Sequence, residues 1–182
     1  MWMYWNRDGS LVEMCVNGSR CIAYHFIKES NKTNIRFINN FNIEQEGKYE
    51  DEDELIAVSC PEYTNYSVID KDTYFVRVGV PHVIRYIRNY QGYAEFSNFN
   101  LKSLYEELNN ELNKKLGTRF NVSVVLDSNN KYIRTYEKGV ENETGACGSG
   151  CTAVYYKLGL DKVNFVTSSG ENLFVSKKEN KK

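Results

Sequence analysis

The sequence has little of several features that would point directly to a class of function. Among its 182 residues there are two prolines and two histidines, and 23 Lys and Arg nearly balance 24 Asp and Glu, for a net charge of -1. This balance offers no electrostatic attraction to nucleic acid or to an anionic membrane surface. No apolar run approaches the roughly 20 residues of a membrane-spanning helix. We therefore expect neither nucleic acid nor a membrane as a partner.

Secretory and metal-binding features are scarce as well. The opening segment MWMYWNRDGS has no apolar region after a basic one, so we do not expect a signal peptide. An odd number of cysteines argues against a disulfide framework and indicates a cytoplasmic protein with free thiols. Their spacings, C-x5-C and C-x3-C, are not those of zinc sites, and we expect no metal. The five cysteines are Cys15, Cys21, Cys60, Cys147 and Cys151.

Hydrophobic periodicity in the first third predicts one helix followed by strands. Apolar residues recur at helical spacing in 20–30, and strands are expected at 33–43 and 55–60, the latter ended by a proline. The segment 44–54, EQEGKYEDEDE, is interpreted as an acidic turn or loop. The polar stretch 61–72 is interpreted as a connection between domains.

The remainder predicts a second set of strands and helices. A strand is expected at 73–80, running on into 81–87, and a helix at 102–117 with a capping box of Ser103 and Glu106. Leucines at 104, 108, 112 and 116 would line one face of that helix. Further strands are expected at 121–126 and 131–137, around the turn DSNN, then a helix from 148 and a hairpin at 164–175.

These elements predict a mixed α/β protein of the α+β type with two related lobes. The predicted domains are 1–62 and 63–176, followed by a disordered tail at 177–182.

Two segments far apart in the chain share one pattern. EMCVNGSRC (13–21) and TGACGSGC (144–151) each place a cysteine before small, polar and glycine residues that open a predicted helix. The free N–H groups and the dipole of a helix N-terminus stabilise a thiolate and lower the thiol pKa from roughly 8.5. The same N–H groups can hold a carboxylate, and Gly148 and Gly150 let the backbone approach a ligand closely.

Two activated thiols allow a specific reaction. One thiolate can remove the proton from a substrate α-carbon while the other thiol protonates the opposite face, which inverts the carbon without a cofactor. Other interpretations remain open at this point. A free cysteine is often a small buried hydrophobe, as expected for Cys21, Cys60 and Cys151, and Cys15 and Cys147 can also be that. Either of these two could instead pair with His82 as a nucleophile.

Two long motifs resemble the signatures of the diaminopimelate epimerase family. NRDGSLVEMCVNGSRC (6–21) is similar to the first and TYEKGVENETGACGSG (135–150) to the second, with VGVPH and FNVSVVLD between them in the family's order. The resemblance implies two pseudo-symmetric lobes of mixed sheet around a central helix, with the site in a cleft. It also implies a cofactor-independent isomerase that interconverts LL- and meso-diaminopimelate in lysine biosynthesis and acts as a homodimer.

The resemblance assigns roles to individual residues. It implies that Cys15 and Cys147 are the two acid–base groups, with His82 and Glu137 beside the reacting carbon. The remaining residues would bind substrate: Asn17, Gly18, Gly148 and Ser149 through backbone around the proximal carboxylate, and Asn6, Asn121 and Lys138 at the distal end.

The sequence departs from the family pattern mainly at the distal end. Val80 replaces an asparagine, and Lys138 replaces an arginine, which loses the bidentate fork of a guanidinium. Val16 stands where the family has glycine, Ser149 replaces threonine, and the loop GVENET is one residue longer. These changes retain the proton chemistry and weaken recognition of the distal end. A racemase for another amino acid is therefore an alternative.

The match begins almost at the first signature and ends before the family's final strands. The first lobe is therefore predicted to be incomplete, with a second copy or a partner chain covering its sheet edges. A catalytically degenerate homologue that acts as a binding or partner subunit is the non-enzymatic alternative. A third, nucleic-acid stacking on the aromatic residues of 85–99, RYIRNYQGYAEFSNF, is disfavoured by the neutral charge.

Overall fold

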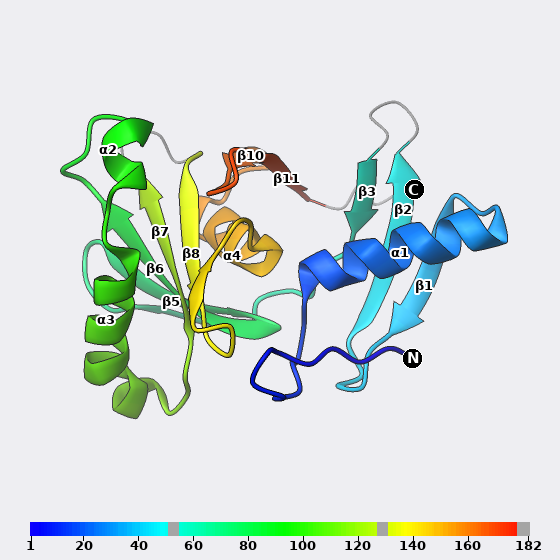
Figure 1. Cartoon of the computed structure of the whole chain (residues 1–182), viewed down its shortest axis with the longest axis horizontal. Helices are drawn as coiled ribbons and strands as arrows, with labels where there is room; N and C mark the ends of the chain where they lie inside the picture. Colours follow the sequence, from blue (N-terminus) through cyan, green and yellow to red (C-terminus); the bar gives the residue numbers. More distant parts are fainter. Residues whose placement is uncertain (51–54, 127–130, 178–182) are drawn as a thin grey trace. The chain divides into compact units, whose positions relative to one another are not determined.

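The computed structural model describes residues 1–50, 55–126 and 131–177. The chain divides into two compact units, Met1–Glu62 and Tyr63–Lys182 (Figure 1). The end of the predicted acidic segment 44–54, the predicted turn DSNN and all but the first residue of the predicted tail lie outside the described residues.

The first unit packs one helix on a three-stranded antiparallel sheet of order β1-β2-β3. Helix α1 begins four residues before the predicted start and lies so close to β2 that a Cβ at Gly47 would come within 2.5 Å of the Ala23 Cβ. The glycine therefore permits the contact that seats the helix on the sheet. The elements are α1 (Val16–Ser30), β1 (Asn34–Ile38), β2 (Glu44–Glu50) and β3 (Leu55–Val58).

The interpretation of 44–54 as a loop is wrong for 44–50, because Glu44–Glu50 forms the central strand of this sheet. Gln45 and Gly47 are buried, whereas Glu44 and Lys48 on the opposite face are exposed. The period of two is therefore present, but its buried positions carry an amide and a glycine in place of apolar side chains. The strand was missed because most of its residues are charged or polar.

The second unit is built on a six-stranded sheet of order β4-β5-β6-β7-β8-β9, in which only β6 and β7 are parallel. A separate hairpin, β10 with β11, follows α4. The strands are β4 (Asn65–Val68), β5 (Thr73–Val78), β6 (Val80–Ile87), β7 (Asn121–Leu126), β8 (Ile133–Glu137), β9 (Asn142–Thr144), β10 (Lys162–Val166) and β11 (Asn172–Ser176). The helices are α2 (Tyr93–Ser97), α3 (Leu101–Leu116) and α4 (Gly148–Leu158).

Two strand predictions need correction. The expected continuous strand through 73–87 is a tight hairpin, because Gly79 adopts φ 65° and turns β5 back on β6. The predicted connection 61–72 contains the fully exposed edge strand β4. An edge strand needs no buried face, so its polar sequence gave no apolar alternation to detect.

Helices α3 and α4 cover opposite faces of the six-stranded sheet (Figure 1). Val83 packs in the core beneath α3, whereas its neighbour His82 contacts α4, as expected for alternate residues of a strand. Leu104, Leu108 and Leu112 of α3 are buried in this core, as predicted. The mixed α+β class is confirmed.

The predicted capping box of α3 is wrong. Asn100 caps the helix instead, since its side-chain oxygen accepts a hydrogen bond from the Ser103 N–H. Ser103 is therefore the third residue of the helix, and Gly117 ends it with φ 65° as expected.

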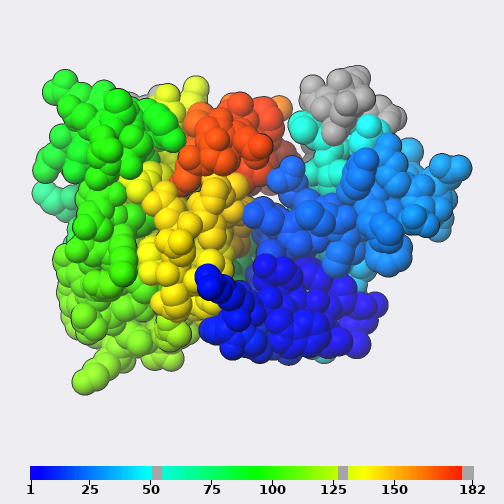
Figure 2. Space-filling model, viewed as in Figure 1, coloured from blue at the N-terminus to red at the C-terminus, as the bar shows by residue number. Residues whose placement is uncertain are grey.

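The surface of the second unit includes α2 and α3, green in Figure 2. The aromatic residues of 85–99 do not form an exposed platform there. Phe96 is fully buried, and Tyr90, Tyr93 and Phe99 pack against the core beneath α3. No described helix is long and apolar enough to cross a membrane.

Candidate functional site

Cys15 is the residue from which helix α1 starts. It adopts an extended conformation, φ -132° and ψ 102°, and its Sγ accepts a hydrogen bond from the Gly18 N–H at 3.4 Å. The thiol therefore lies at the open N–H groups of the helix terminus, as the sequence predicts. Its side chain is partly exposed.

The sheet holds this turn through a buried amide. The Ser19 hydroxyl lies 2.9 Å from the Cys15 carbonyl oxygen and 2.7 Å from Gln45 Oε1, and these two acceptors share its one hydrogen. Gln45 in turn donates from Nε2 to the Ser59 carbonyl at 3.0 Å. The amide buried in β2 thus links the start of α1 to the end of β3, which orients the thiol.

The other predicted site residues of the first unit lie beside this turn or in the N-terminal segment. Asn17 and Gly18 are the second and third residues of α1. Asn6 lies in a loop, where its side chain donates to Ser10 Oγ at 3.2 Å. The segment, dark blue in Figure 2, lies at the surface.

Val16 carries no backbone strain. It is the first residue of α1 and is buried, and it is not among the described residues with positive φ. A branched residue is therefore accommodated where the family has glycine.

Cys147 precedes helix α4 with the backbone conformation that Cys15 has before α1, but its side chain makes no capping hydrogen bond. Its φ of -126° and ψ of 104° are nearly those of Cys15, and Gly148 and Ser149 are the first residues of the helix. Unlike Cys15, it is buried, and its Sγ lies 3.5 Å from the Ser149 hydroxyl oxygen.

A buried chain of polar groups runs from this thiol into the sheet. The Ser149 hydroxyl lies 3.0 Å from His82 Nε2, and the Ser123 hydroxyl lies 3.4 Å from His82 Nδ1. Ser123 and Thr135, paired across β7 and β8, bring their hydroxyl oxygens within 3.0 Å. Gly150 makes room for this chain, because a Cβ there would lie 2.8 Å from Ser123 Oγ and 3.0 Å from Thr135 Oγ1.

Burial determines the charge of His82. The ring is fully buried, which lowers its pKa to about 3, and the positive charge of Lys138 acts in the same direction. His82 is therefore neutral at physiological pH, and the neutral ring forms hydrogen bonds with the hydroxyls of Ser149 and Ser123.

Glu137 ends β8 next to the Cys147 thiol. Its Oε1 accepts a hydrogen bond from the Thr144 hydroxyl at 2.5 Å, and the Cys147 thiol also donates to it. Burial raises the pKa of Glu137, although both hydrogen bonds oppose the shift.

The expected lowering of thiol pKa by the helix terminus is wrong for Cys147. Burial, and then the charge of Glu137, raise its pKa well above that of an ordinary thiol. The Ser149 hydroxyl and the nearby Gly150 N–H act in the opposite direction and are outweighed. Desolvation of the anion exceeds the stabilisation from the helix terminus, so Cys147 is a protonated thiol in the free protein.

The predicted distal residues also adjoin this site. Asn121 opens β7 opposite His82, and its Oδ1 accepts a hydrogen bond from the Lys138 N–H at 3.0 Å. Lys138 follows β8 directly, and Val80 is buried at the start of β6.

The structure thus brings together the predicted residues of the second unit: His82, Asn121, Glu137, Lys138, Cys147, Gly148 and Ser149. Cys15, Asn17 and Gly18 form a second group in the first unit, while Asn6 lies in the loop before it. Sequence reasoning missed Ser123, Thr135 and Thr144, which contact the site through strand register alone. Among the described residues, no group of three or more metal-ligating side chains is arranged to hold an ion.

Comparison with known proteins finds relatives that are named diaminopimelate epimerase. No family model matches the sequence. The diaminopimelate epimerase of Campylobacter jejuni (strain 81116) is 31% identical over 184 residues, which cover 94% of this chain and 68% of that protein. The diaminopimelate epimerase of Helicobacter pylori (strain HPAG1) is 29% identical over 198 residues, covering 97% and 70%.

A solved structure shares the fold. A putative phenazine biosynthesis PhzC/PhzF protein from Clostridium difficile superposes with a TM-score of 0.57 at 16% identity. The match covers 92% of this chain and 66% of that one. The chain therefore spans about two thirds of the length of the proteins that it matches.

Proposed function

Because the chain belongs to the diaminopimelate epimerase family, we propose that it is an isomerase that inverts an amino-acid α-carbon by proton transfer between Cys15 and Cys147. The proposed reaction converts LL-diaminopimelate to the meso form in lysine biosynthesis, in the cytoplasm and without a cofactor. The observation that carries this proposal is the shared geometry of the two cysteines. Each starts a helix with almost the same backbone conformation, so each thiol adjoins N–H groups that can hold a carboxylate.

The proposed step balances in protons and electrons. A Cys15 thiolate takes the α-proton, the electron pair stays on the planar carbon and its carboxylate, and the Cys147 thiol protonates the opposite face. Cys15 ends the step as the thiol and Cys147 as the thiolate, and the reverse reaction restores the starting protonation states. The raised pKa of Cys147 favours its role as the acid in this direction. When Cys147 acts as the base, the adjacent Glu137 can accept its proton.

His82 would act without changing charge. As a neutral ring it holds the Ser149 hydroxyl, which is also near the Cys147 sulfur. We propose that this hydroxyl and the Gly148–Ser149 backbone bind one side of the proximal carboxylate. The Asn17–Gly18 backbone would bind its other side. Asn6, Asn121 and Lys138 would bind the distal end. The active form would be a homodimer, or a complex with a partner chain.

A racemase for another amino acid is the second candidate. The buried Val80 provides no hydrogen bond where the family has an asparagine, and Lys138 provides a point charge rather than a fork.

Exchange of the α-proton tests the proposal directly. Reduced protein is incubated with LL-diaminopimelate and a panel of amino acids in deuterated water, and loss of the α-proton signal is followed by NMR. We expect exchange that falls about 10²–10⁴-fold in Cys15→Ala and in Cys147→Ala. If folded, reduced protein exchanges the α-proton of none of these compounds, the result would favour the alternative of a non-catalytic binding subunit.

Oxidation tests whether the two thiols face each other. If they do, a mild oxidant should join Cys15 to Cys147 and abolish exchange, and a reductant should restore it. Peptide mapping that finds both thiols free after oxidation of folded protein would contradict the facing arrangement.

A further inference from the structure

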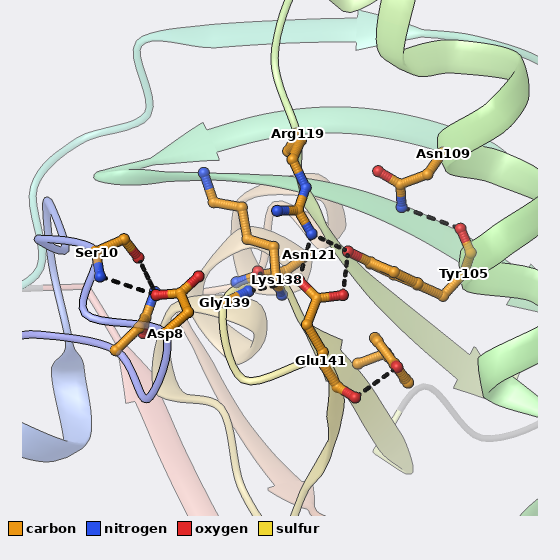
Figure 3. A network of polar contacts seen from close by, with 11 residues as sticks. Asp8, Ser10, Tyr105, Asn109, Arg119, Asn121, Lys138, Gly139 and Glu141 are labelled. Atoms are coloured by element: carbon orange, nitrogen blue, oxygen red, sulfur yellow. Dashed lines mark hydrogen bonds and ion pairs between the residues drawn. The ribbon is translucent and has the colours of Figure 1, made fainter.

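A second polar cluster in the second unit surrounds the turn between β8 and β9, residues 138–141 (Figure 3). Its centre is the Glu141 carboxylate. Oε1 accepts a hydrogen bond from the Gly139 N–H at 2.9 Å and forms an ion pair with the Arg119 guanidinium. Oε2 accepts a longer one, at 3.5 Å, from the Tyr105 hydroxyl.

Two tyrosines complete the cluster. The rings of Tyr105 and Tyr136 stack with centroids 4.1 Å apart, and the Tyr136 hydroxyl donates to the Glu141 carbonyl at 2.7 Å. Arg119 also donates to the Tyr105 hydroxyl at 3.3 Å. Helix α3 and the loop that follows it are thus joined to the turn by charge, hydrogen bonds and stacking.

The turn needs such support because its backbone is unusual. Glu141 adopts φ 55° and Gly139 φ 80°, and a non-glycine residue is disfavoured in this left-handed region. Burial acts to raise the pKa of Glu141, but the Gly139 N–H and Arg119 outweigh it and lower the pKa. Glu141 is therefore charged when it holds the turn.

The other end of the turn belongs to the candidate site. Asn121 accepts the Lys138 N–H at 3.0 Å, and the Glu141 N–H donates to the Glu137 carbonyl at 2.9 Å. Glu137 contacts Cys147, and the charge of Lys138 acts on His82. A shift of this turn would therefore move both residues relative to the thiol.

We propose that Arg119 and Glu141 are positioning residues which fix the β8–β9 turn, and thereby set how well Lys138 binds the distal carboxylate of the substrate. This inference rests on the proposed function. The two residues touch no substrate themselves, and they act on specificity through the turn.

The test compares two substrates in wild type, Arg119→Met and Glu141→Gln. L-Lysine is the useful second substrate, because it differs from diaminopimelate only in lacking the distal carboxylate. In both variants we expect the KM for diaminopimelate to rise about tenfold, with kcat changed less than about threefold and the constants for lysine unchanged. Arg119→Lys, which keeps the charge, should recover part of the loss.

Glu143→Gln is the matched control. Glu143 lies two residues further on and pairs with Arg134 at 2.6 Å, but it does not hold the turn. We expect the ratio of the two KM values to stay at the wild-type level in this variant. The inference is overturned if Glu141→Gln weakens both substrates equally, or if Glu143→Gln changes the ratio as much.

Binding measurements test the positioning role even if the protein does not catalyse the proposed reaction. If wild type exchanges no α-proton, calorimetric dissociation constants for the same two compounds replace the KM values. A tenfold loss confined to diaminopimelate would then still support the positioning role. Absence of diaminopimelate binding to wild type would overturn it.

Discussion

The two cysteine turns have nearly the same backbone and different surroundings. Cys15 and Cys147 differ by only 6° in φ and 2° in ψ, by subtraction of the paired angles, and a glycine is the third residue of each helix. Yet the Cys15 side chain is partly exposed, whereas Cys147 is buried between Ser149 and Glu137.

The difference teaches that a helix terminus positions a thiol but does not determine its acidity. Both turns provide free N–H groups, and these act to stabilise an anion. At Cys147 the sheet strands beneath α4 add burial and the Glu137 carboxylate, which together outweigh that effect. A two-base reaction needs one group protonated and one ready to accept a proton, and the unlike surroundings can supply that difference.

The largest expected effect comes from the equivalent glycines, Gly18 and Gly150. In Gly150→Ala the new methyl would collide with Ser123 Oγ, so we expect about 1–3 kcal/mol loss in the free energy of unfolding. In Gly18→Ala the nearest atoms lie at 3.4–3.5 Å, and alanine should stabilise the helix by about 0.5 kcal/mol. Urea denaturation measures both. Equal losses would show that the two turns are packed alike.

His82 should make the stability of the second unit depend on pH. Its folded pKa of about 3 lies below the unfolded value of about 6.5, so the unfolded state binds more protons as pH falls. Stability should therefore be complete above pH about 6.5 and fall by about 2 kcal/mol at pH 5. The raised pKa of Glu137 acts in the opposite direction. Denaturation of His82→Gln should lack this loss.

NMR provides a direct check on the same residue. The chain has only two histidines, and His25 is exposed on α1. In protein labelled at histidine, the His82 ring should stay neutral down to pH 5. A His82 signal that titrates near pH 6.5 would contradict the assigned burial.

The smallest expected effect concerns the acidity of Cys147. Glu137→Gln removes a negative charge beside the thiol, so the Cys147 pKa should fall, while burial keeps it above that of an ordinary thiol. The pH dependence of iodoacetamide alkylation, read for each cysteine by peptide mapping, measures this. Cys15 is the reference in the same molecule, and an equal shift there would indicate a general loss of structure.

Much of the fold follows from local patterns. The leucine spacing of α3, the pair of strands β7 and β8, and the helices opened by both cysteine turns are all present. Local reasoning failed where burial was not apolar or where a turn was tight. The central strand β2 was missed because it is rich in charged residues, and the turn at Gly79 was missed because strand-like sequence continues on both sides of it. The domain boundaries, the facing of the two thiols and the dimer remain predictions.

By itself, the sequence determined the identity of the family and the two cysteines that start helices. Helix starts and motif spacing depend on neighbouring residues, which a single chain displays directly. Only the tertiary structure decided that Ser123, Thr135 and Thr144 support the site, that His82 is neutral, and that the Cys147 pKa is raised. These properties depend on strand register and on the removal of water, which act between residues far apart in the chain.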